Sequence, residues 1–169
     1  VCKRNNVFFF SIENNINLNC YISKINSIKP DLVLSSNSLY FGKKLLSLDG
    51  TMFINRHTSL LPAYGGLWPV IRAINNYEKL IGVTIHLMSS KIDDGKIIEQ
   101  ASFELNGEKN LFVIYEKAFK LSLAITLRAI KSVDDKNIKF IANNYKKSYF
   151  GMPGKKEIKK FKKLGGQLI

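Results

Sequence analysis

The sequence predicts a three-layer α/β domain whose sheet is mostly parallel and ends in an antiparallel extension. Apolar runs of strand length alternate with segments of helical periodicity through the first half of the chain. Two further strand candidates then follow each other across a short turn, as in an antiparallel pair. The 169 residues, 46% of them apolar, are enough for one domain with a sizeable core.

The first half of the chain contains three strand candidates and two helix candidates. The run from Val7 to Phe10 is the first strand candidate. A helix from about 20 to 28 follows, because Ile22, Ile25 and Ile28 recur at spacing three. Pro30 ends that helix, since the residue before a proline is pushed out of the α region. The other expected elements are a strand at 31–35, a short helix at 42–48 and a strand at 52–54.

The second half opens with a loop at 58–67 that is expected to be irregular, because Pro62 and the pair Gly65 and Gly66 disfavour regular structure. Pro69 then starts a helix, as proline is tolerated in the first turn. The remaining expected elements are strands at 81–88 and 96–105, a long helix at 111–130 and a short basic helix within 155–164. This organisation places a catalytic core at 1–145 and a basic C-terminal tail at 146–169.

The net charge of +13 comes mainly from lysine, since 26 residues are Lys or Arg and 13 are Asp or Glu. Lys, Asn and Ile share AT-rich codons, so we interpret most of the excess as genome composition and solvated surface, not as a nucleic-acid site. The sequence shows no membrane-length apolar run and no signal-peptide pattern. Cys2 and Cys20 could pair, but two cysteines make no disulfide framework, and a reducing cytoplasm is the expected setting.

Three residues that can carry acyl-transfer chemistry lie at the ends of strand candidates. Asn55 and His57 follow the strand at 52–54, and Asp93 follows the strand at 81–88. An amide can donate to an oxyanion, an imidazole can take a proton near neutral pH, and a carboxylate can orient that imidazole. Each residue also has a structural interpretation, as a loop cap, a core histidine and a turn residue respectively.

Other chemistries have weaker support in the sequence. Ser59, His57 and Asp93 have the composition of a hydrolase triad, but the sequence has no Gly-x-Ser-x-Gly elbow to expose a nucleophile. Ser59 is therefore expected to bond the backbone of its own loop. No metal site is expected, because His57 and His86 are the only histidines and lack ligand spacing. His86 is interpreted as structural or as a support for the catalytic residues.

At these residues the chain resembles the formyltransferase family whose members use 10-formyltetrahydrofolate. The matching motifs are Asn-x-His followed by Ser-Leu-Leu-Pro at 55–62, and Gly-Val-Thr-Ile before Ile-Asp-x-Gly at 82–95. The resemblance implies a Rossmann-like sheet with folate at the carboxyl ends of the strands, and catalytic roles for Asn55, His57 and Asp93. It also implies a cis peptide before Pro62. Because Asn55 comes early in the chain, the core is expected to lack the family's N-terminal part.

The same resemblance implies folate contacts in two loop segments. The implied residues are Ser35, Ser36, Asn37, Ser38, Leu39, Ser89, Ile92 and Asp94. The leading function is transfer of a formyl group from the co-substrate 10-formyltetrahydrofolate to a small amine, such as a nucleotide-linked amino sugar. Arg56 and Arg72 could then meet the anionic part of that substrate. The alternatives are a formyltetrahydrofolate hydrolase and a non-catalytic folate- or nucleotide-binding module.

Overall fold

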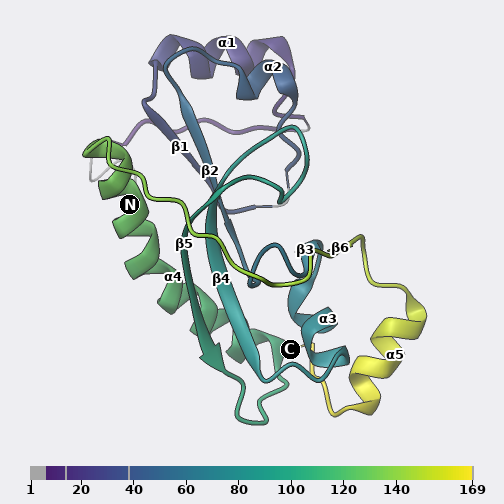
Figure 1. Ribbon diagram of the computed structural model, residues 1–169. Helices are drawn as coiled ribbons and strands as arrows, with labels where there is room; N and C mark the ends of the chain where they lie inside the picture. The colour runs from purple at the N-terminus through teal and green to yellow at the C-terminus, as the bar shows by residue number, and fades with distance from the viewer. Residues whose placement is uncertain (1–6, 14, 38, 169) are drawn as a thin grey trace.

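The computed structural model describes residues 7–13, 15–37 and 39–168, and its central element is a four-stranded sheet (Figure 1). The strands are β1 (Leu32–Ser35), β2 (Met52–His57), β4 (Leu80–Leu87) and β5 (Ile97–Glu104), in the spatial order β1-β2-β4-β5. β1 and β2 run parallel, whereas β4 is antiparallel to both β2 and β5. The α/β class and the antiparallel extension are confirmed.

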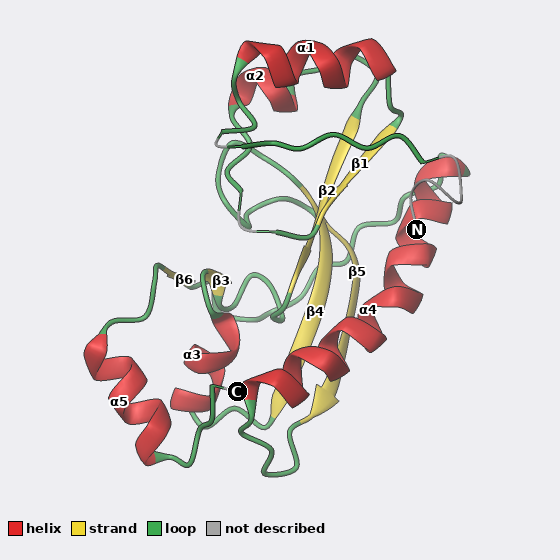
Figure 2. Cartoon of the chain, turned by 180° about the vertical axis from the view of Figure 1, so that it is seen from behind, coloured by secondary structure: helices red, strands yellow, loops and turns green. Residues whose placement is uncertain are grey.

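Helices cover both faces of this sheet and give the expected three layers. α1 (Asn19–Ile28) and α2 (Lys43–Leu46) pack on one face, around Phe53 of β2. α4 (Leu111–Asp134) packs on the other face, against Ile54, and runs along β4 and β5 (Figure 2). Phe53 and Ile54 serve different layers because side chains alternate between the two faces of a strand.

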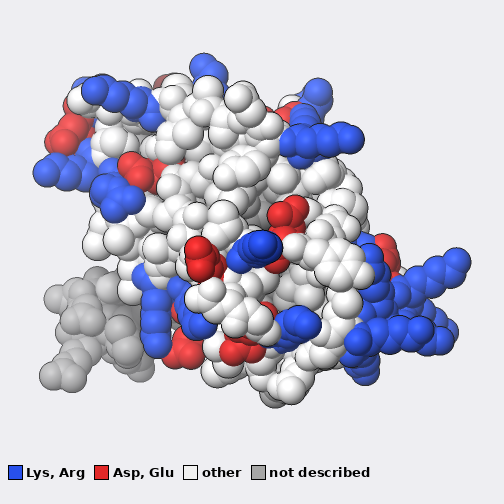
Figure 3. All heavy atoms as spheres, turned by 60° about the horizontal axis from the view of Figure 1, so that its bottom comes forward, with Lys and Arg blue, Asp and Glu red and all other residues white. Residues whose placement is uncertain are grey.

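The basic tail helix is docked onto the rest of the molecule. α5 (Lys155–Lys163) packs against α3 (Pro69–Asn75), and Phe161 of α5 is fully buried in a cluster with Val70, Ile74 and Leu111. Its lysines remain exposed and gather at one side of the molecule (Figure 3). The predicted amphipathic helix is confirmed, while the domain boundary at residue 145 stays a prediction.

One strand expectation and one loop expectation are wrong. The segment 7–10 is coil, and Phe8 and Phe9 are 67% and 72% exposed, because no described strand lies beside them to complete a hydrogen-bonded ladder. The parallel part of the described sheet is consequently the single pair β1 and β2. The loop at 58–67 is not wholly irregular, because β3 (Gly65–Gly66) pairs in parallel with β6 (Tyr149–Phe150), a distant partner that local pattern cannot reveal.

Two further expectations concern membrane-spanning segments and the pairing of Cys2 with Cys20. Among the described residues, no helix combines the length and the apolar character that crossing a membrane requires. Cys20 is exposed on α1, whereas Cys2 lies outside the described residues. The pairing of the two cysteines therefore stays a prediction.

Candidate active site

Asn55, His57 and Asp93 converge on one cleft, as their spacing in the sequence predicts. Asn55 and His57 are alternate residues of β2 and therefore point to the same face, and Asp93 lies in the turn after β4. The Asn55 Nδ2 atom is 3.5 Å from Asp93 Oδ1, and His57 Nδ1 is 3.6 Å from Asp93 Oδ2. The three side chains thus form one connected group around the carboxylate.

The His57 ring is oriented by a backbone carbonyl. Its Nε2 lies 2.9 Å from the Tyr64 carbonyl oxygen, which can only accept, so Nε2 carries the hydrogen and donates it. In the neutral ring Nδ1 is then unprotonated and faces Asp93. Burial lowers the pKa of His57 below its ordinary value, and Asp93 and the Tyr64 carbonyl only partly oppose this shift. His57 is therefore a neutral base near pH 7, with Nδ1 as its basic atom.

Asp93 is held as a carboxylate in a turn of unusual conformation. Its φ is 52°, in the left-handed region that Asp tolerates better than most residues, and its side chain is 8% exposed. The Gly66 N–H donates to Oδ2 over 2.7 Å. Burial raises the pKa of Asp93, but His86, His57 and the Gly66 N–H together outweigh it, so the pKa lies below the ordinary value. The group is ionised at neutral pH and can stabilise a protonated His57.

His86 supports this group from the neighbouring strand. It pairs with Asn55 across β2 and β4 and is 1% exposed. Its Nδ1 donates to the Leu87 carbonyl over 2.8 Å, so in the neutral ring Nε2 can accept from Asn55 Nδ2, 3.3 Å away. Nε2 also lies 3.5 Å from Asp93 Oδ1. The interpretation of His86 as a support agrees with these contacts, although sequence reasoning could not connect it with Asn55 without the strand register.

Asn55 retains hydrogen-bonding capacity toward the cleft. One Nδ2 hydrogen can go to His86, and the other faces Asp93 at 3.5 Å, which is long for a hydrogen bond. Asn55 Oδ1 is buried and has no partner among the described residues. Because an unpaired buried acceptor costs free energy, this oxygen is suited to receive a donor from a bound molecule.

Two glycines allow the backbone approaches that build the site. Gly66 has a φ of 94°, and a Cβ there would overlap the carbonyl of Phe150 in β6. Gly95, the last residue of the Ile-Asp-x-Gly motif, leaves no room for a Cβ beside the Leu87 carbonyl. The motif glycine is therefore required for the turn that carries Asp93 to fold back on β4.

The residues implied for folate divide into two groups. Five of them line the same cleft of about 240 Å³ as the three candidate catalytic residues: Ser35, Asn37, Leu39, Ser89 and Ile92. The side chains of the other described residues are engaged elsewhere, since Ser36 accepts from Arg56 Nε and Asp94 pairs with Lys147. Ser38 lies outside the described residues.

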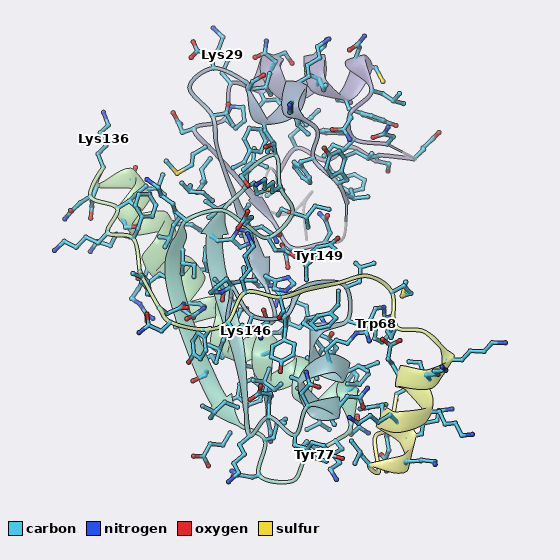
Figure 4. All side chains as sticks on the ribbon, turned by 45° about the vertical axis from the view of Figure 1, so that its right-hand side comes forward. Lys29, Trp68, Tyr77, Lys136, Lys146 and Tyr149 are labelled. Atoms are coloured by element: carbon cyan, nitrogen blue, oxygen red, sulfur yellow. The ribbon has the colours of Figure 1, made fainter. Side chains whose placement is uncertain are left out.

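The cleft also has walls that sequence reasoning missed. Tyr40 and Phe41 contribute from the loop after β1, and Leu67 and Tyr149 contribute from the β3–β6 region. In Figure 4, Tyr149 lies at mid-height, between the end of the molecule that carries α1 and the end that carries α3. Tyr149 is separated from His57 by more than 90 positions in the sequence, so only the pairing of β3 with β6 could have indicated it.

The two arginines expected near an anionic substrate lie in different environments. Arg72 is buried, pairs with Glu157 of α5 and stacks 5.1 Å from the Phe150 ring centroid. It joins α3 to the tail and does not line the cleft. Arg56 does line the cleft. The expectation that Arg72 meets an anionic substrate is therefore wrong, because its guanidinium is already paired with the Glu157 carboxylate of the same chain.

Three smaller expectations concern the loop and metal binding. The Leu61–Pro62 peptide bond is cis, as expected. Ser59 Oγ donates to the Ala63 carbonyl over 2.8 Å, which confirms its local role. Within the described residues no group of three or more His, Cys, Asp or Glu is placed to hold a metal ion.

Comparison with known proteins defines the class to which this fold and cleft belong. The formyl transferase family matches residues 11–130, and the chain belongs to that family. A methionyl-tRNA formyltransferase from Halothermothrix orenii is 31% identical over 121 residues, which cover 71% of this chain and 38% of that protein. The chain thus spans well under half the length of this curated relative.

Solved structures agree with the family assignment. A sugar N-formyltransferase from a Shewanella species superposes with a TM-score of 0.71 and 25% identity, covering 82% of this chain and 55% of that one. An N-formyltransferase from Helicobacter canadensis, in complex with folinic acid and dTDP-3-aminofucose, gives a TM-score of 0.64. Its identity is 21%, with 89% of this chain and 52% of that chain covered, so it supports the fold alone.

Proposed function

We propose that this cleft transfers a formyl group from 10-formyltetrahydrofolate to an amine. The observation that carries the proposal is the connected group of Asn55, His57 and Asp93, with neighbouring atoms 3.5 and 3.6 Å apart. An amide donor, a neutral imidazole and a carboxylate can supply the oxyanion donor, the base and the charge partner for acyl transfer to an amine. The buried Asn55 Oδ1, which has no partner among the described residues, supports this proposal because it can accept a hydrogen bond from a bound molecule.

Each residue has one task in this reaction. Bound 10-formyltetrahydrofolate would supply the formyl carbon, and the acceptor would supply the attacking amine. Asn55 donates a Nδ2 hydrogen to the formyl oxygen as that oxygen gains negative charge. His57 takes the proton released by the amine at Nδ1 and returns it to the departing folate nitrogen. Asp93 faces Nδ1 and stabilises the imidazolium between these two steps.

Folate is proposed to lie between the loop after β1 and the loop before Asp93. Ser35, Asn37 and Leu39 supply one wall, and Ser89 and Ile92 supply the other. This arrangement follows the general position of ligands in open α/β sheets, outside the carboxyl ends of the strands. Ser36 and Asp94, whose side chains are engaged elsewhere, would contribute through their backbone alone.

For the acceptor we favour a small amine, with a nucleotide-linked amino sugar as the leading candidate. Support comes from the Shewanella sugar N-formyltransferase, which is similar over 82% of this chain. The curated relative in Halothermothrix orenii acts, by its name, on methionyl-tRNA, so the chain's family alone does not decide between the two acceptors. The cytoplasmic setting stays a prediction.

Competition binding tests both the folate and the acceptor. 5-Formyltetrahydrofolate, a stable analogue of the co-substrate, should bind the full chain and protect the Ser89–Asp93 loop from hydrogen exchange. The folate-loaded protein should then bind dTDP-linked amino sugars more tightly than a methionyl-tRNA. Absence of folate binding would contradict the proposal. Tight binding of only the tRNA, with a steep salt dependence, would overturn the choice of acceptor.

A further inference from the structure

Arg56 occupies the variable position between Asn55 and His57 and has surroundings unlike those of the other described arginines. Strand alternation turns its side chain to the α4 face of β2, the face of Ile54. Its guanidinium carbon lies 3.9 Å from the centroid of the Phe119 ring. Its Nε donates to Ser36 Oγ over 2.7 Å, and its Nη1 lies 3.4 Å from Thr58 Oγ1.

No carboxylate neutralises this cation within the described chain. Arg72 pairs with Glu157 and Arg128 with Glu99, whereas Arg56 forms no ion pair among the described residues. The residues outside the described ranges include no Asp or Glu. Arg56 is half-buried, and burial lowers its pKa, which outweighs the opposing influence of Tyr115. A partly desolvated guanidinium with only hydroxyl partners has capacity for an anion.

We infer that Arg56 binds the phosphate or diphosphate group of the formyl acceptor. The stack on Phe119 and the bond to Ser36 fix the plane of the guanidinium, and its remaining N–H groups can meet two phosphate oxygens at once. Phe119 is 50% exposed, so the site is open to a ligand. Arg56 borders the cleft that holds His57, although its side chain turns to the α4 face. β1 pairs with β2 only as far as Ser35, opposite Asn55, so a molecule with its amine at His57 can place its anion at Arg56 by passing round the end of β1.

The identity of that molecule rests on the proposed formyl transfer, but the anion site rests on Arg56 and its neighbours. A phosphate of an RNA backbone offers the same chemistry. We favour the small acceptor because a sugar N-formyltransferase is similar to this chain over 82% of its length.

Calorimetric titration with inorganic pyrophosphate and with dTDP tests the site without any formyl transfer. Arg56→Gln should weaken the binding of both by about tenfold to a hundredfold, the effect expected for losing hydrogen bonds to a charged group. Arg56→Lys, which keeps the charge but lacks the planar fork, should lie between that variant and wild type. Arg128→Gln is the matched control, because it removes one exposed arginine of α4, and it should change binding less than about twofold.

Several results would overturn the inference. These are unchanged binding in Arg56→Gln, an equal loss in Arg128→Gln, or an equal loss of 5-formyltetrahydrofolate binding in Arg56→Gln. Binding of a transfer RNA that depends on Arg56, with no binding of pyrophosphate or dTDP, would also overturn it. If wild type formylates no amine while Arg56→Gln selectively loses pyrophosphate, the proposed function fails and the anion site stands.

Discussion

His57 and His86 both lie in the cleft, but their ring nitrogens have different partners. His57 donates through Nε2 to Tyr64 and leaves Nδ1 facing the Asp93 carboxylate. His86 donates through Nδ1 to the Leu87 carbonyl, and its Nε2 meets Asn55. When His57 is protonated, both of its N–H groups therefore face an acceptor, the Tyr64 carbonyl at Nε2 and the Asp93 carboxylate at Nδ1. This difference supports the proposal that His57 transfers the proton and that His86 orients Asn55.

Replacing Asn55 with Ala should lower turnover much more than folate affinity. In the proposed mechanism the amide donates to the oxygen that becomes charged in the transition state, and losing one such donor costs about a hundredfold to a thousandfold in kcat. The dissociation constant for 5-formyltetrahydrofolate, measured in parallel, should change less than about threefold. Asn26→Ala, at an exposed position of α1, is the control. Turnover near the wild-type value in Asn55→Ala would make the residue structural.

The acid limb of the pH profile should report the protonation of His57. Burial lowers the pKa of His57, so the ring stays neutral down to a pH below its ordinary value of about 6.5. The kcat should fall as the pH drops through that pKa, because only the neutral ring accepts a proton.

Asp93→Asn removes the charge that raises the pKa of His57. NMR titration of the His57 imidazole should accordingly show a lower pKa in this variant than in wild type, together with a kcat reduced by about a hundredfold or more. A His57 pKa that rises in Asp93→Asn would show that the carboxylate does not stabilise the imidazolium.

At the scale of elements, the β3–β6 pair connects the distant C-terminal segment with the turn that carries Asp93. Gly66 of β3 donates its N–H to Asp93 and lies against Phe150 of β6. Replacing Gly66 with Ala should force β6 away or turn the N–H from Asp93. We expect a kcat lowered by about tenfold or more, as the Asp93 carboxylate loses a charge-assisted hydrogen bond.

The matched control for this change is Gly151→Ala. Gly151 is adjacent to β6, its φ is not positive, and a Cβ there would meet nothing within 4 Å. Its kcat should stay within about twofold of wild type, in line with ordinary surface substitutions. Equal losses of activity in both variants would mean that the C-terminal segment does not act through Gly66.

The docked α5 should stabilise the whole fold. Phe161 is fully buried among residues of α3 and α4, so Phe161→Ala should lower the free energy of unfolding by about 3–5 kcal/mol. Phe112→Ala removes the same side chain from a position that is 67% exposed and should cost less than about 1 kcal/mol. Urea unfolding of both variants measures the difference. Equal midpoints would mean that α5 is not part of the cooperative core.

At the scale of the whole molecule, local patterns predicted the elements but not all of their partners. The Ile22, Ile25 and Ile28 periodicity and the Pro30 stop define α1 to within one residue. The apolar run at 7–10 has the same composition as a buried strand, yet it is coil, because a strand requires a neighbour that the run itself does not encode.

The candidate site was predictable where a single short motif gives both the identity of a residue and the face or turn from which its side chain extends. Asn-x-His puts Asn55 and His57 on one face of β2, and Ile-Asp-x-Gly puts Asp93 in a tight turn. The partners of these residues come from the strand register and from long-range pairing. His86, Gly66 and Tyr149 could be placed in the cleft only once the strands were aligned.

The most direct test of formyl transfer by this cleft follows the labelled formyl carbon. The full chain is incubated with 10-formyltetrahydrofolate carrying a ¹³C formyl group and with a set of dTDP-linked amino sugars, and the product carbon is detected by NMR. We predict a formamide signal that requires both the amine and the protein and that is lost in Asp93→Asn but retained in Arg128→Gln. A signal from formate alone, or label that stays on the folate with wild-type protein, would contradict formyl transfer to an amine.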